Sequence, residues 1–193
     1  GSHILYERNP NYWDKPKPYI DKLVVKIIPD AATRTIALET GALDLGSDTP
    51  MPMSEIERIK SNSKLGIETR GYGYSPTQTR IEFNLDNQYL KNLKVRQAIA
   101  HSINLEVLKR VVWYGYAVNS PTPITPELAQ FHDSTPSPYG FDLAKANQLL
   151  DEAGFPRQAN GIRFTLVHDY MPYGDSFKRV AEYLKSALAK VGI

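Results

Sequence analysis

The sequence predicts an α/β fold, or its α+β variant, built around a mixed sheet. Short runs rich in β-branched residues, such as 23–28 and 162–168, alternate with segments whose apolar residues recur at helical spacing, such as 95–103. The 193 residues are 41% hydrophobic and 23% charged, which is typical of a globular protein with a buried core. No internal repeat and no low-complexity segment interrupts this pattern.

Residues 4–6 are strand-like, and the next predicted strand is 23–28, which Pro29 closes. Its Leu, Val and Ile content predicts that it is buried. Asp30 then precedes a partial apolar stripe over 31–40, which predicts a capped helix, and Gly41 is expected to end that helix.

A second, short helix is predicted to end at Lys60. Ser54 and Glu57 have the three-residue spacing of a capping box, so we expect them to begin it. Two further strands are predicted at 65–70 and 79–85, separated by a turn rich in Gly and Tyr.

Three Asn or Asp side chains are expected to cap the helices of the second half, because such side chains accept hydrogen bonds from first-turn amides: Asn92, Asn104 and Asp142. The segment 115–141 holds five prolines and two glycines, which predicts a long ordered loop. After the strand predicted at 162–168, apolar spacing over 177–191 predicts a final amphipathic helix that Gly192 ends.

Composition limits the possible partners and chemistry. The 23 basic and 21 acidic residues give a net charge of +2, which predicts no nucleic-acid partner. The absence of Cys excludes disulfide frameworks, thiolate zinc sites and cysteine nucleophiles. No apolar run approaches the roughly 20 residues of a membrane helix, and no signal-peptide pattern opens the sequence. Gly1, Ser2 and His3 are expected to be the scar of a cleaved expression tag, so 4–193 is expected to be an excised fragment.

Catalysis has little support in the sequence. His168 and Asp169 are adjacent, and neighbouring residues on a strand point to opposite faces, which disfavours a catalytic His–Asp hydrogen bond. The four His residues are scattered, without a His-x-x-x-His pair or an acidic calcium loop. We therefore predict no enzyme activity, no cofactor and no metal site, and a hydrolytic enzyme domain stays a minor alternative.

A protein-interaction module is the other alternative, because the amino-terminal part is basic. Its basic residues are Arg8, Lys15, Lys17 and Lys22. These side chains could also form a solvated charged face.

Several motifs, in order, resemble those of one known family. The matching segments are 9–13 (NPNYW) with 18–21, 27–33, 38–44, 83–84 with 93–104 (LKVRQAIAHSIN), 115–117 with 120–121, 142–156 and 188–193. Ser102 and Asn104 depart from it, since Ala and Asp are commoner there. Together these segments resemble the extracytoplasmic solute-binding proteins, family 5, which serve peptide and nickel ABC transporters.

The resemblance implies a type II periplasmic-binding-protein-like fold, in which two α/β lobes joined by a hinge close on ligand. It implies that 4–193 is a single α/β lobe and that sequence outside this range supplies the other. The ligand would be a small solute, namely an oligopeptide, dipeptide, sugar or metal chelate, which the protein delivers to an ABC permease. The whole protein is expected to be a monomer located outside the cytoplasm, in the periplasm or lipid-anchored to the membrane.

The resemblance places the loop 169–176 at the ligand cleft. Tyr170 and Tyr173 could stack on a ligand, and Asp169 and Asp175 could accept hydrogen bonds from it. The alternative is structural: Asp175 or Ser176 caps the final helix, and Tyr170 packs on the sheet.

A second candidate patch opens the Pro-rich loop and consists of Tyr114, Tyr116 and Asn119. Aromatic and amide side chains suit ligand contact. The alternative is that these side chains anchor the loop to the core.

Overall fold

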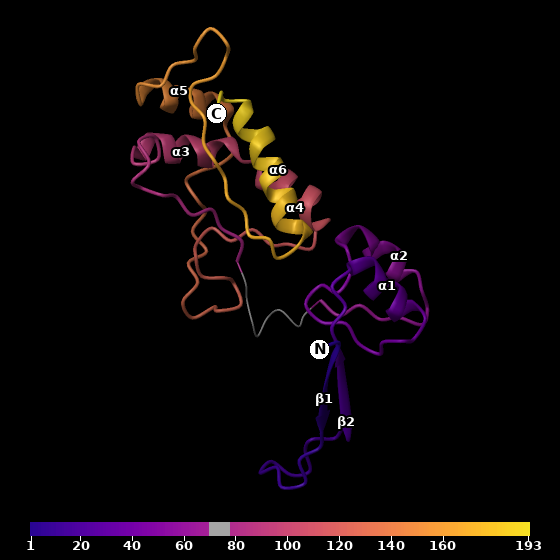
Figure 1. The fold of residues 1–193 in the computed structure, drawn as a ribbon. Coiled ribbons are helices and arrows are strands. Elements are labelled where there is room, and N and C mark those ends of the chain that lie inside the picture. The colour runs from indigo at the N-terminus through magenta and orange to yellow at the C-terminus, as the bar shows by residue number, and fades with distance from the viewer. Residues whose placement is uncertain (70–77) are drawn as a thin grey trace. The chain divides into compact units, whose positions relative to one another are not determined.

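The computed structural model describes residues 1–69 and 78–193, which form two compact units, Gly1–Ile67 and Glu68–Ile193 (Figure 1). Each unit is described by itself. The turn predicted at 71–76 lies outside the described residues. The assignment of 4–193 to a single lobe stays a prediction.

The first unit contains a two-stranded antiparallel ribbon, β1 (His3–Glu7) and β2 (Lys22–Lys26), in which Leu5 pairs with Val24. The strand predicted at 23–28 is confirmed in position, but its predicted burial is wrong, because every residue of both strands is exposed. Among the described residues this sheet has only two strands, so neither face of the ribbon gains a core.

The helix α1 (Ala31–Glu39) begins as predicted at Asp30, whose carboxylate accepts hydrogen bonds from the amide and hydroxyl of Thr33 at 2.6 and 2.7 Å. These bonds lower the pKa of Asp30. Gly41 follows the helix with φ +72°, the left-handed conformation that favours glycine.

The predicted capping box at Ser54 and Glu57 is wrong. Ser54 lies inside a 3-10 turn, η1 (Met53–Glu55), and therefore cannot precede the helix α2 (Ile56–Lys60). The N-cap of α2 is Glu55, and it makes no side-chain capping hydrogen bond. Ile56 and Ile59 are buried and hold this short helix in the unit.

The second unit contains α3 (Leu93–Ser102), α4 (Leu105–Trp113), α5 (Leu143–Glu152) and α6 (Asp175–Ala189). The three predicted caps are confirmed. Asn92, Asn104 and Asp142 accept first-turn amides at 2.9, 3.0 and 2.9 Å, respectively. The long predicted loop is also confirmed, since 115–141 contains neither helix nor strand.

Two hydrophobic clusters hold these helices. The larger lies between α3 and α5 and is formed by Val95, Ala98, Ile99, Ala146, Leu149, Leu150, Phe164 and Val191. Tyr89 stacks on Phe164 at 4.3 Å between ring centroids. The smaller lies where α4 and α6 pack side by side and is formed by Val112, Val180 and Leu184 (Figure 1).

The strands predicted at 79–85 and 162–168, and at the described part of 65–70, are wrong: these residues form no strand. A strand requires a neighbour for its backbone ladder, and only β1 and β2 form one among the described residues. Phe83 and Phe164 still pack into the larger cluster. The apolar residues of these segments therefore contribute to the core without forming a sheet. The described residues of the second unit are therefore helical, and the chain combines these helices with the small β1–β2 sheet.

Candidate functional site

The helices α4 and α6 run in opposite directions and are joined by polar contacts near both ends of α4. At its beginning, the hydroxyl of Tyr183 accepts a hydrogen bond from the amide of Asn104 at 2.9 Å and donates one to the carbonyl of Asn104 at 3.0 Å. Burial raises the pKa of the Tyr183 hydroxyl. This contact holds α6 to the N-terminal end of α4.

At the C-terminal end of α4, Arg179 lies between Asp175 and Tyr114. Its Nε donates a hydrogen bond to the Asp175 carboxylate, one turn earlier on α6. Its Nη1 donates to the Tyr114 hydroxyl at 3.4 Å, and its Cζ lies 6.0 Å from the centroid of the Tyr114 ring. The hydrogen bond to Asp175 is the main reason that the pKa of Arg179 is raised. We call these three residues the α4–α6 junction.

The loop before α6 is well exposed. Tyr170 and Tyr173 are 42% and 81% exposed, and Met171 and Asp169 are also exposed. The structural alternative for this loop is wrong in its capping part, because the N-cap of α6 is Gly174 and it makes no side-chain capping bond. Asp175 lies instead in the first helical turn, where its carboxylate faces Arg179.

The second candidate patch is divided. Tyr114 belongs to the junction, but Asn119 donates its amide hydrogen to Glu106 at 2.5 Å, back in the first turn of α4. Lys109 pairs with the same carboxylate at 2.8 Å, and these two partners, Lys109 first, lower the pKa of Glu106. The anchoring alternative therefore describes Asn119.

Tyr116 is half-buried, and its backbone amide donates to the carbonyl of Trp113 at 2.8 Å. Its backbone is thereby fixed to the end of α4. Its place close to Tyr114 in the sequence keeps it beside the junction.

Arg179 was missed by the sequence analysis. The signal that could have found it is the four-residue spacing from Asp175, since an acid and a base four residues apart on a helix are neighbours. The spatial approach to Tyr114, 65 positions earlier, has no counterpart in the sequence.

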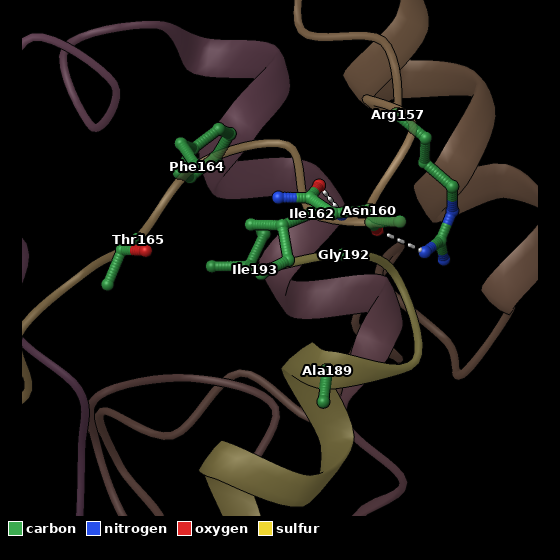
Figure 2. Close-up of a pocket in the computed structure, with 9 residues that line it drawn as sticks. Arg157, Asn160, Ile162, Phe164, Thr165, Ala189, Gly192 and Ile193 are labelled. Atoms are coloured by element: carbon green, nitrogen blue, oxygen red, sulfur yellow. Dashed lines mark hydrogen bonds between the residues drawn. The ribbon is translucent and has the colours of Figure 1, made fainter.

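A hollow of about 390 Å³ lies at the C-terminal end of the second unit and is mainly apolar, with Ile162, Phe164 and Ile193 among its lining residues (Figure 2). Figure 2 shows the side chain of Arg157 reaching the carbonyl of Gly161, at 2.8 Å. Arg157 also donates to a second backbone carbonyl, at Lys190. None of the predicted site residues lines this hollow.

The histidines give no catalytic constellation. His168 and Asp169 are both exposed, and Nδ1 of His101 lies 2.7 Å from the carbonyl of Gly140. Within residues 1–69 and 78–193, no three His, Cys, Asp or Glu side chains gather in a way that could hold a metal ion. Across the same ranges, no helix has the length and apolar character needed to cross a membrane.

The basic amino-terminal part is largely neutralised in the structure. Arg8 pairs with Asp21 at 3.2 Å, Lys17 with Asp14 at 2.9 Å, and the ammonium of Lys22 with Glu7 at 3.5 Å. Lys15 donates to the carbonyl of Pro10. These pairings favour a solvated charged face over a basic docking patch.

Comparison with solved structures defines the class of protein: its structural relatives are type II periplasmic binding proteins. NikA from Brucella suis, solved with Fe(III)-EDTA, has a TM-score of 0.75 and 31% identity, over 100% of this chain and 40% of that one. DppA from Helicobacter pylori, solved with the peptide STSA, has a TM-score of 0.73 and 26% identity, over 100% of this chain and 35% of that one.

The particular family follows from the sequence. The family described as bacterial extracellular solute-binding proteins, family 5 Middle, matches residues 1–193, and the chain belongs to it. Heme-binding protein A of Haemophilus influenzae is 30% identical over 98% of this chain and 33% of its own length. The dipeptide-binding protein of Escherichia coli is 28% identical over 100% of this chain and 34% of its own length. The chain thus spans about a third of these relatives.

Proposed function

We propose that this chain is a ligand-recognising part of the substrate-binding component of an ABC importer. The component would act outside the cytoplasm and deliver a small solute, such as a peptide or a related molecule, to a membrane permease. Family membership supports the proposal, and so does the naming of the relatives as binding proteins for dipeptide, glutathione and heme. The observation that carries it in this chain is the exposed Tyr170–Tyr173 loop beside the α4–α6 junction.

Each side chain of this region has a chemical role in the proposal. Tyr170 and Tyr173 supply ring faces for stacking together with hydroxyls for hydrogen bonding. Asp169 offers an exposed carboxylate to an amine or hydroxyl of the ligand. Tyr116 belongs to the proposed set beside Tyr114. Asn119, whose side-chain nitrogen is bonded to Glu106, belongs to it through the oxygen of its side-chain amide.

Asp175 has a different proposed role from the one expected for a free acceptor. Its carboxylate already accepts a charge-assisted hydrogen bond from Arg179. We therefore propose that it contacts ligand as part of an acid–base pair, which can offer both an acceptor and a donor to a polar group.

Closure of two lobes supplies the mechanism. A ligand that contacts both lobes favours the closed form by its differential affinity for that form, and the permease then recognises the closed protein. We propose that residues 4–193 lie in one lobe and hold only part of these contacts. Isothermal titration should therefore show poor binding or none by the segment 4–193 and clear binding by the full-length protein; equal affinities would contradict the proposal.

The proposed function is tested by a thermal-shift panel on the full-length protein. The panel contains alanyl-alanine, reduced glutathione, haemin and a nickel–histidine complex. A solute present at 100 times its Kd adds about 2.7 kcal/mol of stability, which is a measurable rise in the unfolding temperature. We expect one of the four to raise it; no shift with any of them would reject these solute classes.

A further inference from the structure

We propose that Arg179 is a positioning residue, which couples the loop that enters α6 to the end of α4 so that the two candidate ligand-binding segments move as one surface. The proposal rests on the proposed function only where it calls these segments ligand-binding. The coupling itself is a property of the protein without ligand.

The guanidinium lies where the loop before α6 ends and the Pro-rich loop after α4 begins. Asp175 is the first residue of α6, directly after the exposed loop 169–174. Tyr114 is the C-cap of α4, directly before the Pro-rich loop. The Arg179 side chain thus bonds to the helix-end residue that adjoins each segment. It uses Nε for Asp175 and Nη1 for Tyr114.

Tyr114 has a backbone conformation that contacts with other residues must stabilise. Its backbone is left-handed, with φ 51° and ψ 29°, a conformation that residues with a Cβ rarely adopt. Its amide donates to the carbonyl of Lys109, and its ring and hydroxyl face Arg179. The contact with Arg179 therefore helps to hold Tyr114 in this conformation.

Other contacts already hold α4 and α6 together, so a change at Arg179 can alter the position of the loops without unfolding the protein. Val112, Val180 and Leu184 form the buried contact between α4 and α6, and Tyr183 fixes the other end. The Arg179 and Asp175 side chains are 40% and 62% exposed, and ion pairs this exposed contribute little to global stability. Loss of the Arg179–Asp175 ion pair should loosen the contact between α6 and the C-terminal end of α4 and leave the fold intact.

The test is amide hydrogen exchange in the full-length, ligand-free protein. The reporter is the Tyr116 amide, which donates to the carbonyl of Trp113 at the end of α4 and lies in the loop after α4, away in the sequence from Asp175 and Arg179. We expect Asp175→Asn and Arg179→Met to speed its exchange about two- to five-fold, the range for loss of an exposed ion pair. Arg179→Lys should restore part of the protection.

Two further variants keep the test decisive. Tyr114→Phe removes only the hydroxyl and should also speed exchange at Tyr116. Lys94→Met removes a comparably exposed ion pair, with Glu152 at 2.9 Å between α3 and α5, and should leave Tyr116 unchanged.

The proposal is overturned if Asp175→Asn and Arg179→Met leave exchange at Tyr116 as it was, or if Lys94→Met alters it equally. Because no ligand enters the experiment, these outcomes are independent of the solute panel. A coupled junction in a protein that binds none of the four solutes would leave the coupling standing and reject only the proposed solute classes.

Discussion

Replacement of Arg163 by Met is expected to destabilise the second unit strongly. The Arg163 side chain is only 2% exposed and enters the space between α5 and the C-terminal residues. Its Nε donates to the carbonyl of Val191 at 2.9 Å, and its Nη2 donates to the side chain of Asn147 at 3.0 Å. Its Nη1 donates to the carbonyl of Phe155 at 2.5 Å and to the carboxylate of Asp151.

The expected loss follows from these partners. Methionine restores most of the apolar volume but no donor, so three protein acceptors other than Asp151 lose a charged partner. Hydrogen bonds to charged groups are worth about 1.5–3 kcal/mol each, although the measured losses do not add fully. Asp151 is 57% exposed and regains water, so its ion pair is discounted. We therefore expect a destabilisation of about 3–4 kcal/mol, within the range for breaking a buried charged network.

Urea-induced unfolding of the full-length protein measures this loss. The matched control is Arg58→Met, because Arg58 is also ion-paired, in its case with two carboxylates, but its side chain is 50% exposed. The control should cost less than about 1 kcal/mol. If Arg163→Met were no more destabilising than Arg58→Met, the reasoning that the buried guanidinium organises this region would be refuted.

Three further changes test other parts of the structure. Asp142→Ala removes the cap that accepts the Lys145 amide and should lower the unfolding free energy by about 1 kcal/mol in a urea titration. Tyr183→Phe removes both hydrogen bonds to Asn104 and should lower the unfolding temperature more than an exposed Tyr→Phe change does. Neighbouring side chains lower the pKa of Glu106 below the ordinary 4.5, so its contribution to stability is complete above that pH and is lost as the pH falls through the lower folded value. Glu106→Gln should therefore reduce the acid sensitivity of the urea midpoint below about pH 4.5, and an unchanged profile would contradict the assignment.

Local features of the fold were predictable from the sequence. A cap depends on one side chain and the amides two or three residues later, so Asp30, Asn92, Asn104 and Asp142 could be read directly. The capping prediction for Ser54 was wrong because Met53–Glu55 form a 3-10 turn and α2 begins only after it.

Non-local features were not predictable in the same way. The β-branched content of 162–168 predicted a strand, but a strand also needs a neighbouring backbone, which no local pattern specifies. The candidate site shows the same limit. Its exposed tyrosines were found by residue type, whereas the approach of Arg179 to Tyr114 depends on how α4 and α6 pack.

We propose that the loop before α6 recognises a transported solute. The most direct test is isothermal titration of the full-length protein with the panel solute that raises its unfolding temperature. Wild type is compared with the double variant Tyr170→Ala/Tyr173→Ala. Phe141→Ala is the control, because Phe141 is an exposed aromatic residue outside the loop before α6. Two stacking rings are worth about 0.5–1.5 kcal/mol each, so the double variant should bind about tenfold more weakly while the control binds as the wild type does. An affinity of the double variant within about twofold of wild type would contradict the claim.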